Sequence, residues 1–162
     1  MKLFLSSAML LLSAGLFAQT NFSGTWALNE SKSNFGDSQF RMASSAIVAT
    51  QDAKVLTVET TRPGMDGQEM KSTAKYNLDG TPSENPGFGN SVRKSTTKWS
   101  ADKSALTIAS TMTFDMGGEA RTITTSETWK LSEGGKVLLV ENVMPGFEGG
   151  AEMKTTAAYD KK

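Results

Sequence analysis

The sequence has 162 residues, a length typical of one domain, with 17 basic and 17 acidic side chains. Without a basic excess the chain is not expected to bind nucleic acid, because phosphate contacts need clustered positive charge. It contains no cysteine and no histidine, which excludes disulfides, thiolate or imidazole metal sites and histidine-based catalytic triads. The composition favours a binding protein over an enzyme and suggests no cofactor or metal.

The N-terminal residues follow the pattern of a secretory signal peptide. The positive Lys2 is followed by a mostly apolar run over 3–12, and the small residue Ala18 marks a cleavage site. The run is shorter than the ~20 residues that a membrane-spanning helix needs. We expect cleavage of residues 1–18, which leaves 19–162 as one exported domain, and an uncleaved anchor is the alternative. An exported chain without cysteine suits a bacterial periplasm or the surrounding medium.

An alternation of apolar and polar residues with period two begins near residue 40 and predicts half-buried strands. In the clearest stretch, 104–116, Leu106, Ile108 and Met112 share one face and threonines occupy the other. Threonine and valine, which strands prefer, are abundant throughout. The chain after the signal peptide has no convincing apolar stripe with helical spacing, so the sequence predicts an all-β protein.

An internal repeat organises these strands into hairpins. Each copy has a strand, a Gly-rich turn and a returning strand that ends in an aromatic residue. The copies are 54–76 and 136–159, which match well, and 106–129 and 82–99, which match more loosely. With an N-terminal pair near 22–28 and 40–51, the repeat predicts about ten strands.

Short antiparallel strands in a meander leave unpaired edges unless the sheet closes. We therefore predict a single antiparallel up-and-down β-barrel of 8–10 strands, with a two-sheet sandwich as the alternative. The outer faces of such a barrel would carry Glu69, Lys71 and Lys75. Charged side chains on the outer face argue against a barrel that spans a membrane.

A short motif near the start of the mature chain, Phe22-Ser23-Gly24-Thr25-Trp26, carries a family resemblance. A Gly-x-Trp on the first strand, followed by a meander, resembles the calycin superfamily of lipocalins, fatty-acid-binding proteins and avidins. The sequence of this motif is most similar to that of small exported lipocalin-like proteins of bacteria, which largely lack an assigned function. The resemblance implies a lipocalin-like barrel with Trp26 as a structural residue at its closed base.

The chain departs from the fatty-acid-binding proteins of this superfamily in two places. Residues 29–39 leave no room for the two helices that those proteins carry between their first strands. Their last strand carries an Arg-x-Tyr that holds the ligand carboxylate, whereas this chain has Ala157-Ala158-Tyr159, and their other interior arginine falls at Glu127. The resemblance therefore does not imply fatty-acid binding here.

The repeat gives the two ends of the barrel different chemistry. One end collects large rings, expected to plug the base: Trp26, Tyr76, Trp99, Trp129 and Tyr159. A sugar site built by stacking on these rings is the alternative. The other end collects apolar side chains at or near the turns: Met65, Phe88, Met116 and Phe147. Because loop tips are normally polar, these residues form either a rim that admits a ligand or docks a protein, or the last layer of the core.

Arginines lie near the same end as the apolar turns. By strand parity Arg62, Arg93 and Arg121 are expected to point inward, where guanidinium groups could bind a carboxylate, sulfate or phosphate. Small inner residues, including Ser95 and Ser110, favour space inside the barrel. The alternative is pairing with an internal carboxylate, for which the candidates are Glu59, Asp115 and Glu127.

These patterns predict an exported protein that holds a small apolar or amphiphilic ligand in the barrel, with the arginines favouring an anionic one. The expected ligand-binding residues are Arg62, Arg93, Arg121, Met65, Phe88, Met112, Met116 and Phe147. A protein–protein interaction module with a filled barrel and an apolar rim is the first alternative. A carboxylate-dependent hydrolase is the second.

Overall fold

The computed structural model describes residues 18–36, 43–64, 67–146 and 150–162. Its ten strands are β1 (Gly24–Leu28), β2 (Ala46–Gln51), β3 (Val55–Pro63), β4 (Glu69–Asn77), β5 (Ser83–Pro86), β6 (Val92–Trp99), β7 (Ala105–Met116), β8 (Glu119–Ser132), β9 (Val137–Met144) and β10 (Met153–Lys161). They form one antiparallel sheet in the order β4-β3-β2-β1-β10-β9-β8-β7-β6-β5. The predicted signal peptide lies outside the described residues apart from Ala18, and it stays a prediction.

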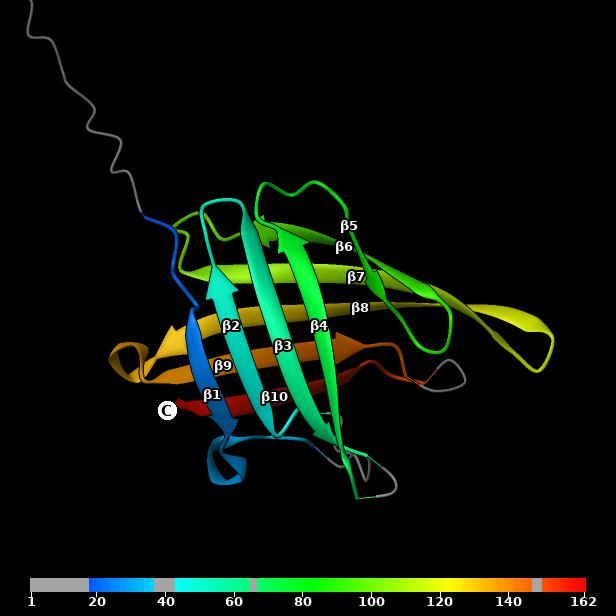
Figure 1. The fold of residues 1–162 in the computed structure, drawn as a ribbon, viewed down its shortest axis with the longest axis horizontal. Helices are drawn as coiled ribbons and strands as arrows, with labels where there is room; N and C mark the ends of the chain where they lie inside the picture. Colours follow the sequence, from blue (N-terminus) through cyan, green and yellow to red (C-terminus); the bar gives the residue numbers. More distant parts are fainter. Residues whose placement is uncertain (1–17, 37–42, 65–66, 147–149) are drawn as a thin grey trace, which may run out of the picture.

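The sheet curves into a nearly closed barrel, as predicted. Figure 1 shows β1 to β4 as a layer that crosses in front of β6 to β10, with a long β7–β8 hairpin projecting at one side. The two layers belong to one continuous sheet, because β1 pairs with both β2 and β10. The sandwich alternative is therefore wrong.

The barrel closes between β4 and β5 through side chains, since no backbone ladder joins these two strands. The Asn85 side chain takes the place of a backbone unit: its Oδ1 accepts from the Lys75 N–H at 2.7 Å and its Nδ2 donates to the Lys75 carbonyl at 2.9 Å. Asn77 Nδ2 donates to the Pro82 carbonyl at 3.0 Å, and Thr97 Oγ1 donates to the Asn77 carbonyl. The otherwise open edges of the sheet are thereby partly satisfied.

All four predicted hairpins are present, as β3–β4, β5–β6, β7–β8 and β9–β10. The N-terminal pair is shorter than the predicted 22–28 and 40–51, in part because Phe22 leaves the strand to enter the core. Between β1 and β2 the described residues form one 3-10 turn, Glu30–Lys32, capped by the Asn29 side chain.

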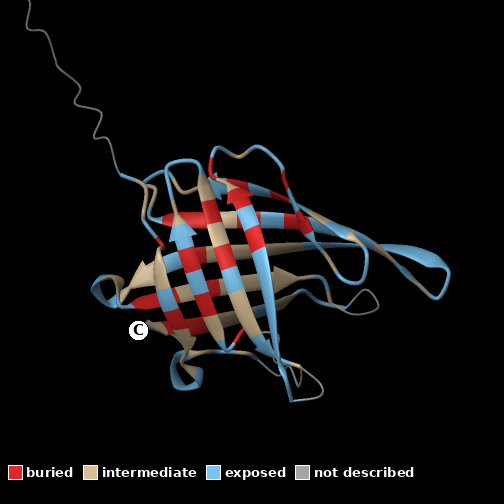
Figure 2. Ribbon diagram, viewed as in Figure 1, coloured by how far each residue is buried: buried red, intermediate tan, exposed pale blue. Residues whose placement is uncertain are grey.

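Aromatic rings fill the base of the barrel, and Phe22 lies at their centre. Its ring stacks on Trp99 with centroids 6.0 Å apart and meets Trp129 edge-on at 5.8 Å. Trp26 is fully buried, and its Nε1 donates to the Phe22 carbonyl at 3.0 Å. Figure 2 shows buried residues gathered where the two layers cross, whereas the tip of the β7–β8 hairpin is exposed.

Packing explains why the Gly-x-Trp motif has a glycine at its first position. Gly24 has a φ of +152°, and a Cβ there would meet the Lys161 side chain at 3.1 Å and the Trp26 ring at 3.4 Å. The missing side chain lets the Lys161 Nζ lie 5.3 Å from the centroid of the Trp26 ring, a cation–π distance. The motif therefore joins the first strand to the last at the base.

We predict that Phe22→Ala lowers the free energy of unfolding by roughly 3–5 kcal/mol, because it leaves a cavity between Trp99 and Trp129. Phe88→Ala is the matched control. Phe88 is 72% exposed, whereas Phe22 is 0% exposed, so we expect its loss to cost less than about 1 kcal/mol. Urea unfolding of the two variants measures both values, and equal losses would contradict a base that depends on Phe22.

Candidate ligand-binding site

The inner face of the barrel is closed at the base and open at the opposite end. Along β3 the inner residues change from the buried Leu56 and Val58 to the exposed Arg62. Along β4 they change from Tyr76, 6% exposed, to Met70, 65% exposed. The same gradient is present on β7, β8 and β9. We call the open end the mouth, and its inner-face residues are Arg62, Met70, Met112, Ile123 and Met144.

A group of charged and phenolic side chains extends from above the base to Arg62 at the mouth, and we call it the polar cluster. Its members are Arg62, Tyr76, Arg93, Glu127 and Tyr159. The Arg93 Nη2 lies 3.4 Å from the Tyr76 hydroxyl, and Arg62 Nε donates to Ser44 Oγ at 3.2 Å. Glu127 Oε2 accepts from Trp129 Nε1 at 3.3 Å. Five different strands contribute these groups.

The repeat explains why two tyrosines reach the same region. Tyr76 faces Leu56 across the β3–β4 hairpin, and Tyr159 faces Leu138 across the β9–β10 hairpin. The two Leu–Tyr pairs occupy matching positions in the repeat. Both rings are buried, and their hydroxyl groups reach the polar cluster rather than only plugging the base.

Burial raises the pKa of Tyr76 and of Tyr159 to about 12. The charge of the Glu127 carboxylate adds to the rise at both phenols, and the Arg62 guanidinium opposes it at both. Arg93 also opposes the rise at Tyr76, and a backbone hydrogen bond with Ser44 does so at Tyr159. Both phenols therefore keep their protons at neutral pH, and each can donate a hydrogen bond.

The charges of the polar cluster do not neutralise one another by direct contact. Glu127 forms no ion pair with Arg62 or Arg93 within the described part of the chain. Arg93 Nε is buried and has no hydrogen-bond partner there, although buried donors are nearly always paired. Guanidinium and phenol donors around an incompletely paired interior can bind an anion.

Two predicted site arginines reach the polar cluster and the third does not. Arg62 and Arg93 belong to it, and Met112 lies opposite Arg93 in the ladder. Arg121 shares the inner face of the sheet, but it pairs with Phe114 far out on the projecting β7–β8 hairpin and is exposed. No direct contact joins Arg121 to the polar cluster.

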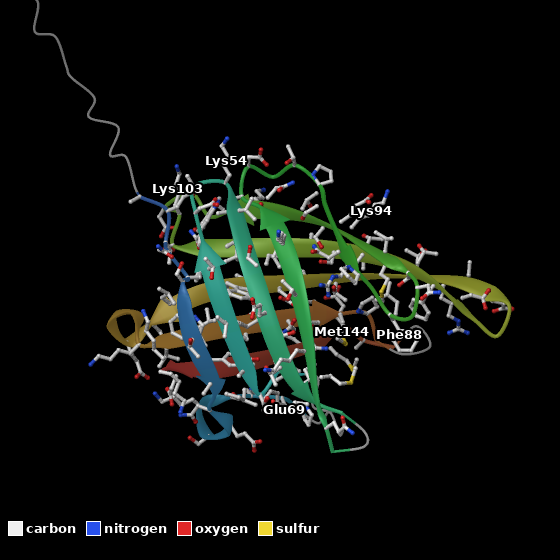
Figure 3. All side chains as sticks on the ribbon, viewed as in Figure 1. Lys54, Glu69, Phe88, Lys94, Lys103 and Met144 are labelled. Carbon is white, nitrogen blue, oxygen red and sulfur yellow. The ribbon has the colours of Figure 1, made fainter. Side chains whose placement is uncertain are left out.

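The predicted apolar rim is described only in part. Phe88 is exposed, meets Phe114 edge-on at a centroid distance of 6.1 Å, and donates its N–H to the sulfur of Met112 at 3.1 Å. Figure 3 shows Phe88 and Met144 toward the side from which the β7–β8 hairpin projects. Met65 and Phe147 lie outside the described residues, as does the side chain of Met116.

A cleft of about 380 Å³ opens in the barrel wall near the mouth. The β8–β9 ladder ends at the pair Ser126 and Val143, after which β9 pairs with β10 alone. The cleft lies at this fork and is lined by both faces of the wall, Ser126 and Val143 from outside and Thr125 and Met144 from inside. Sequence analysis missed it, because the end of a ladder leaves no mark in the apolar pattern.

Neither a metal site nor a membrane helix is found in the described ranges. They contain no cluster of three or more acidic residues able to hold a metal ion. Their helical segments are short 3-10 turns, and none has the length and apolar character of a transmembrane helix.

Comparison with known proteins gives one structural match that bears on the fold. No family model and no curated protein matches the sequence. The crystal structure of a zebrafish ileal bile-acid-binding protein complexed with cholic acid matches with a TM-score of 0.54 at 15% sequence identity. The match covers 87% of this chain and 98% of that chain. It confirms the predicted fold, a single antiparallel up-and-down β-barrel.

We predict that stability falls as pH rises from about 10 to 12. An unfolded tyrosine loses its proton near pH 10, whereas Tyr76 and Tyr159 keep theirs to about pH 12 in the folded state. In this window the unfolded chain binds fewer protons, so each tyrosine removes up to about 2–3 kcal/mol of stability. Tyr76→Phe should reduce the pH dependence of urea unfolding over this range.

Phenolate absorbance measures the same property directly, because the chain has two tyrosines. In the native protein we expect almost no phenolate at pH values near 10. Titration of both phenols near pH 10 without unfolding would contradict their burial in the polar cluster.

Proposed function

We propose that the protein binds a small amphiphilic molecule with an anionic head group inside the barrel. The observation that carries this proposal is the polar cluster itself. Two guanidiniums and two protonated phenols lie on the inner face between the base and the mouth, and Arg93 Nε is buried there without a hydrogen-bond partner among the described residues. Charge-assisted hydrogen bonds to a carboxylate or sulfate would satisfy these donors.

The apolar part of the ligand is placed on the mouth side of the cluster. The base is filled by Phe22 and the tryptophans, so a ligand has room only in the other direction. Glu127 of the polar cluster pairs with Asn142 on β9. The next inner row, about 7 Å closer to the mouth, holds Thr125 and Met144 and lines the wall cleft. An apolar tail that leaves the cluster therefore meets Met112, Ile123, Met144 and the cleft.

Binding is proposed rather than catalysis. The structural neighbour is a binding protein that was crystallised with cholic acid, a small amphiphile, which supports the same class of ligand for this barrel. The N-terminal pattern of residues 1–18 supports the further proposal that the protein works outside the cytoplasm.

We predict that Arg93→Met weakens the binding of decyl sulfate by about tenfold or more, because it removes charge-assisted hydrogen bonds to the head group. Binding of decanol, which has the same tail and no charge, should change by less than about twofold. Isothermal titration calorimetry below the micellar concentration measures both. Arg93→Lys keeps the charge but loses the planar fork, and should give an intermediate loss.

Lys94→Met is the matched control, because Lys94 is the next residue on β6 and lies on the outer face. It is exposed and pairs with Glu84 at 3.3 Å, so its loss removes the same charge without touching the interior. Equal weakening by Lys94→Met and Arg93→Met would mean that net charge, and not the polar cluster, binds the probe. A wild-type protein that binds neither probe would overturn the proposal.

Export is tested by the mass of the protein recovered from its own cells. We expect an intact mass that begins at Gln19, in the envelope fraction or the medium. Native mass spectrometry of the same sample should show an additional mass that is lost on denaturation. A chain that retains Met1 in the cytoplasm would contradict export.

A further inference from the structure

We propose that Glu127 restricts the head group of the ligand to a single negative charge, and so selects monoanions such as carboxylates and sulfates over phosphate monoesters. This inference rests on the proposed function and adds the charge of the ligand to it. From the sequence alone, Glu127 was expected only as a candidate ion-pair partner for an inward-pointing arginine.

The carboxylate of Glu127 is fixed where the head group would lie. Its backbone faces Ile108 on β7 and Asn142 on β9, both on the inner face of the barrel. Ile108 is buried, and Glu127 Oε2 accepts from Trp129 Nε1 at 3.3 Å. Trp129 is itself held in the base, which leaves Glu127 little freedom to turn out to solvent.

The charge of Glu127 reaches both sides of the cluster. It acts on Tyr76 from β4 and on Tyr159 from β10, two strands far apart in the order of the sheet. Arg62 acts on the same two phenols. The carboxylate and the guanidiniums therefore surround one region, and a head group bound there would interact with all of them.

The charges of the cluster sum to one positive charge. Arg62 and Arg93 supply two positive charges, Glu127 supplies one negative charge, and the two phenols are neutral below about pH 12. A monoanion makes the region neutral. A dianion leaves an excess negative charge next to the half-buried Glu127, where uncompensated charge is more costly than in water.

Glu127→Gln tests this inference, because glutamine has the same shape and its amide oxygen can still accept from Trp129 Nε1. The probes are decyl sulfate and decyl phosphate, which have the same tail and a similar tetrahedral head. At about pH 8 the sulfate carries one charge and the phosphate nearly two, since the second phosphate pKa is about 6. Calorimetric titration gives the ratio of the two affinities for each protein.

We expect the wild-type protein to bind decyl sulfate about tenfold or more tightly than decyl phosphate, and Glu127→Gln to reduce this ratio by about tenfold. Glu141→Gln is the matched control. Glu141 lies on the outer face of β9 in an exposed pair with Lys154 at 3.1 Å, so its loss should leave the ratio within about twofold.

The outcomes separate the two proposals. If the wild-type protein binds decyl sulfate and Glu127→Gln leaves the ratio unchanged, the role of Glu127 is overturned and the proposed function stands. If the wild-type protein binds neither probe, the proposed function fails and the inference fails with it. A ratio that shifts equally in Glu141→Gln would show a general effect of net charge and would also overturn the inference.

Discussion

Phe22 packs between Trp99 and Trp129 at one end of the barrel, with ring centroids 6.0 and 5.8 Å away. Large rings at this end exclude water and ligand alike, because each buries about 150–250 Å². The inner face above them is not filled in the same way, and its exposure increases steadily toward Met70 and Ile123. One closed end therefore determines the depth of the interior, the position of the polar cluster and the direction in which an apolar tail can extend.

Closure of the sheet without a complete ladder is the second constraint. A regular backbone ladder between β4 and β5 would close the sheet into a complete ring of hydrogen-bonded strands. Here the Asn85 side chain supplies one donor and one acceptor to the backbone of Lys75. The other hydrogen bonds of this seam come from the side chains of Asn77 and Thr97. The wall is interrupted again at the fork of β8 and β9. Backbone hydrogen bonds thus join neighbouring strands around the barrel except at the β4–β5 seam, and the wall opens further at the fork near the mouth.

The period of two and the repeat were enough to predict the ten strands, the four hairpins and the inward parity of Arg62 and Arg93, because parity is local to each strand. They were not enough to predict that the Tyr76 hydroxyl meets Arg93, or that the charge of Arg62 acts on Tyr159. That contact depends on the curvature of the sheet, which brings β3, β4, β6 and β10 around one space. Arg121 shows the opposite case, since its parity is inward but its strand has already left the barrel. Met65 and Phe147 stay untested, because they lie outside the described residues.

The polar cluster is not what stability alone would favour. Well-packed apolar residues in place of a buried ionic group are often neutral or stabilising, and the buried Val58, Ile108 and Val140 on the same inner face show that this barrel accommodates such packing. In the part of the chain that the structure describes, buried Arg93 Nε lacks a partner, and the Glu127 carboxylate accepts from Trp129 rather than from a guanidinium. An arrangement whose donors and acceptors remain partly unpaired costs free energy in the empty protein. A complementary head group would recover that cost, and this is the physical reason for proposing the cluster as a binding site rather than as part of the core.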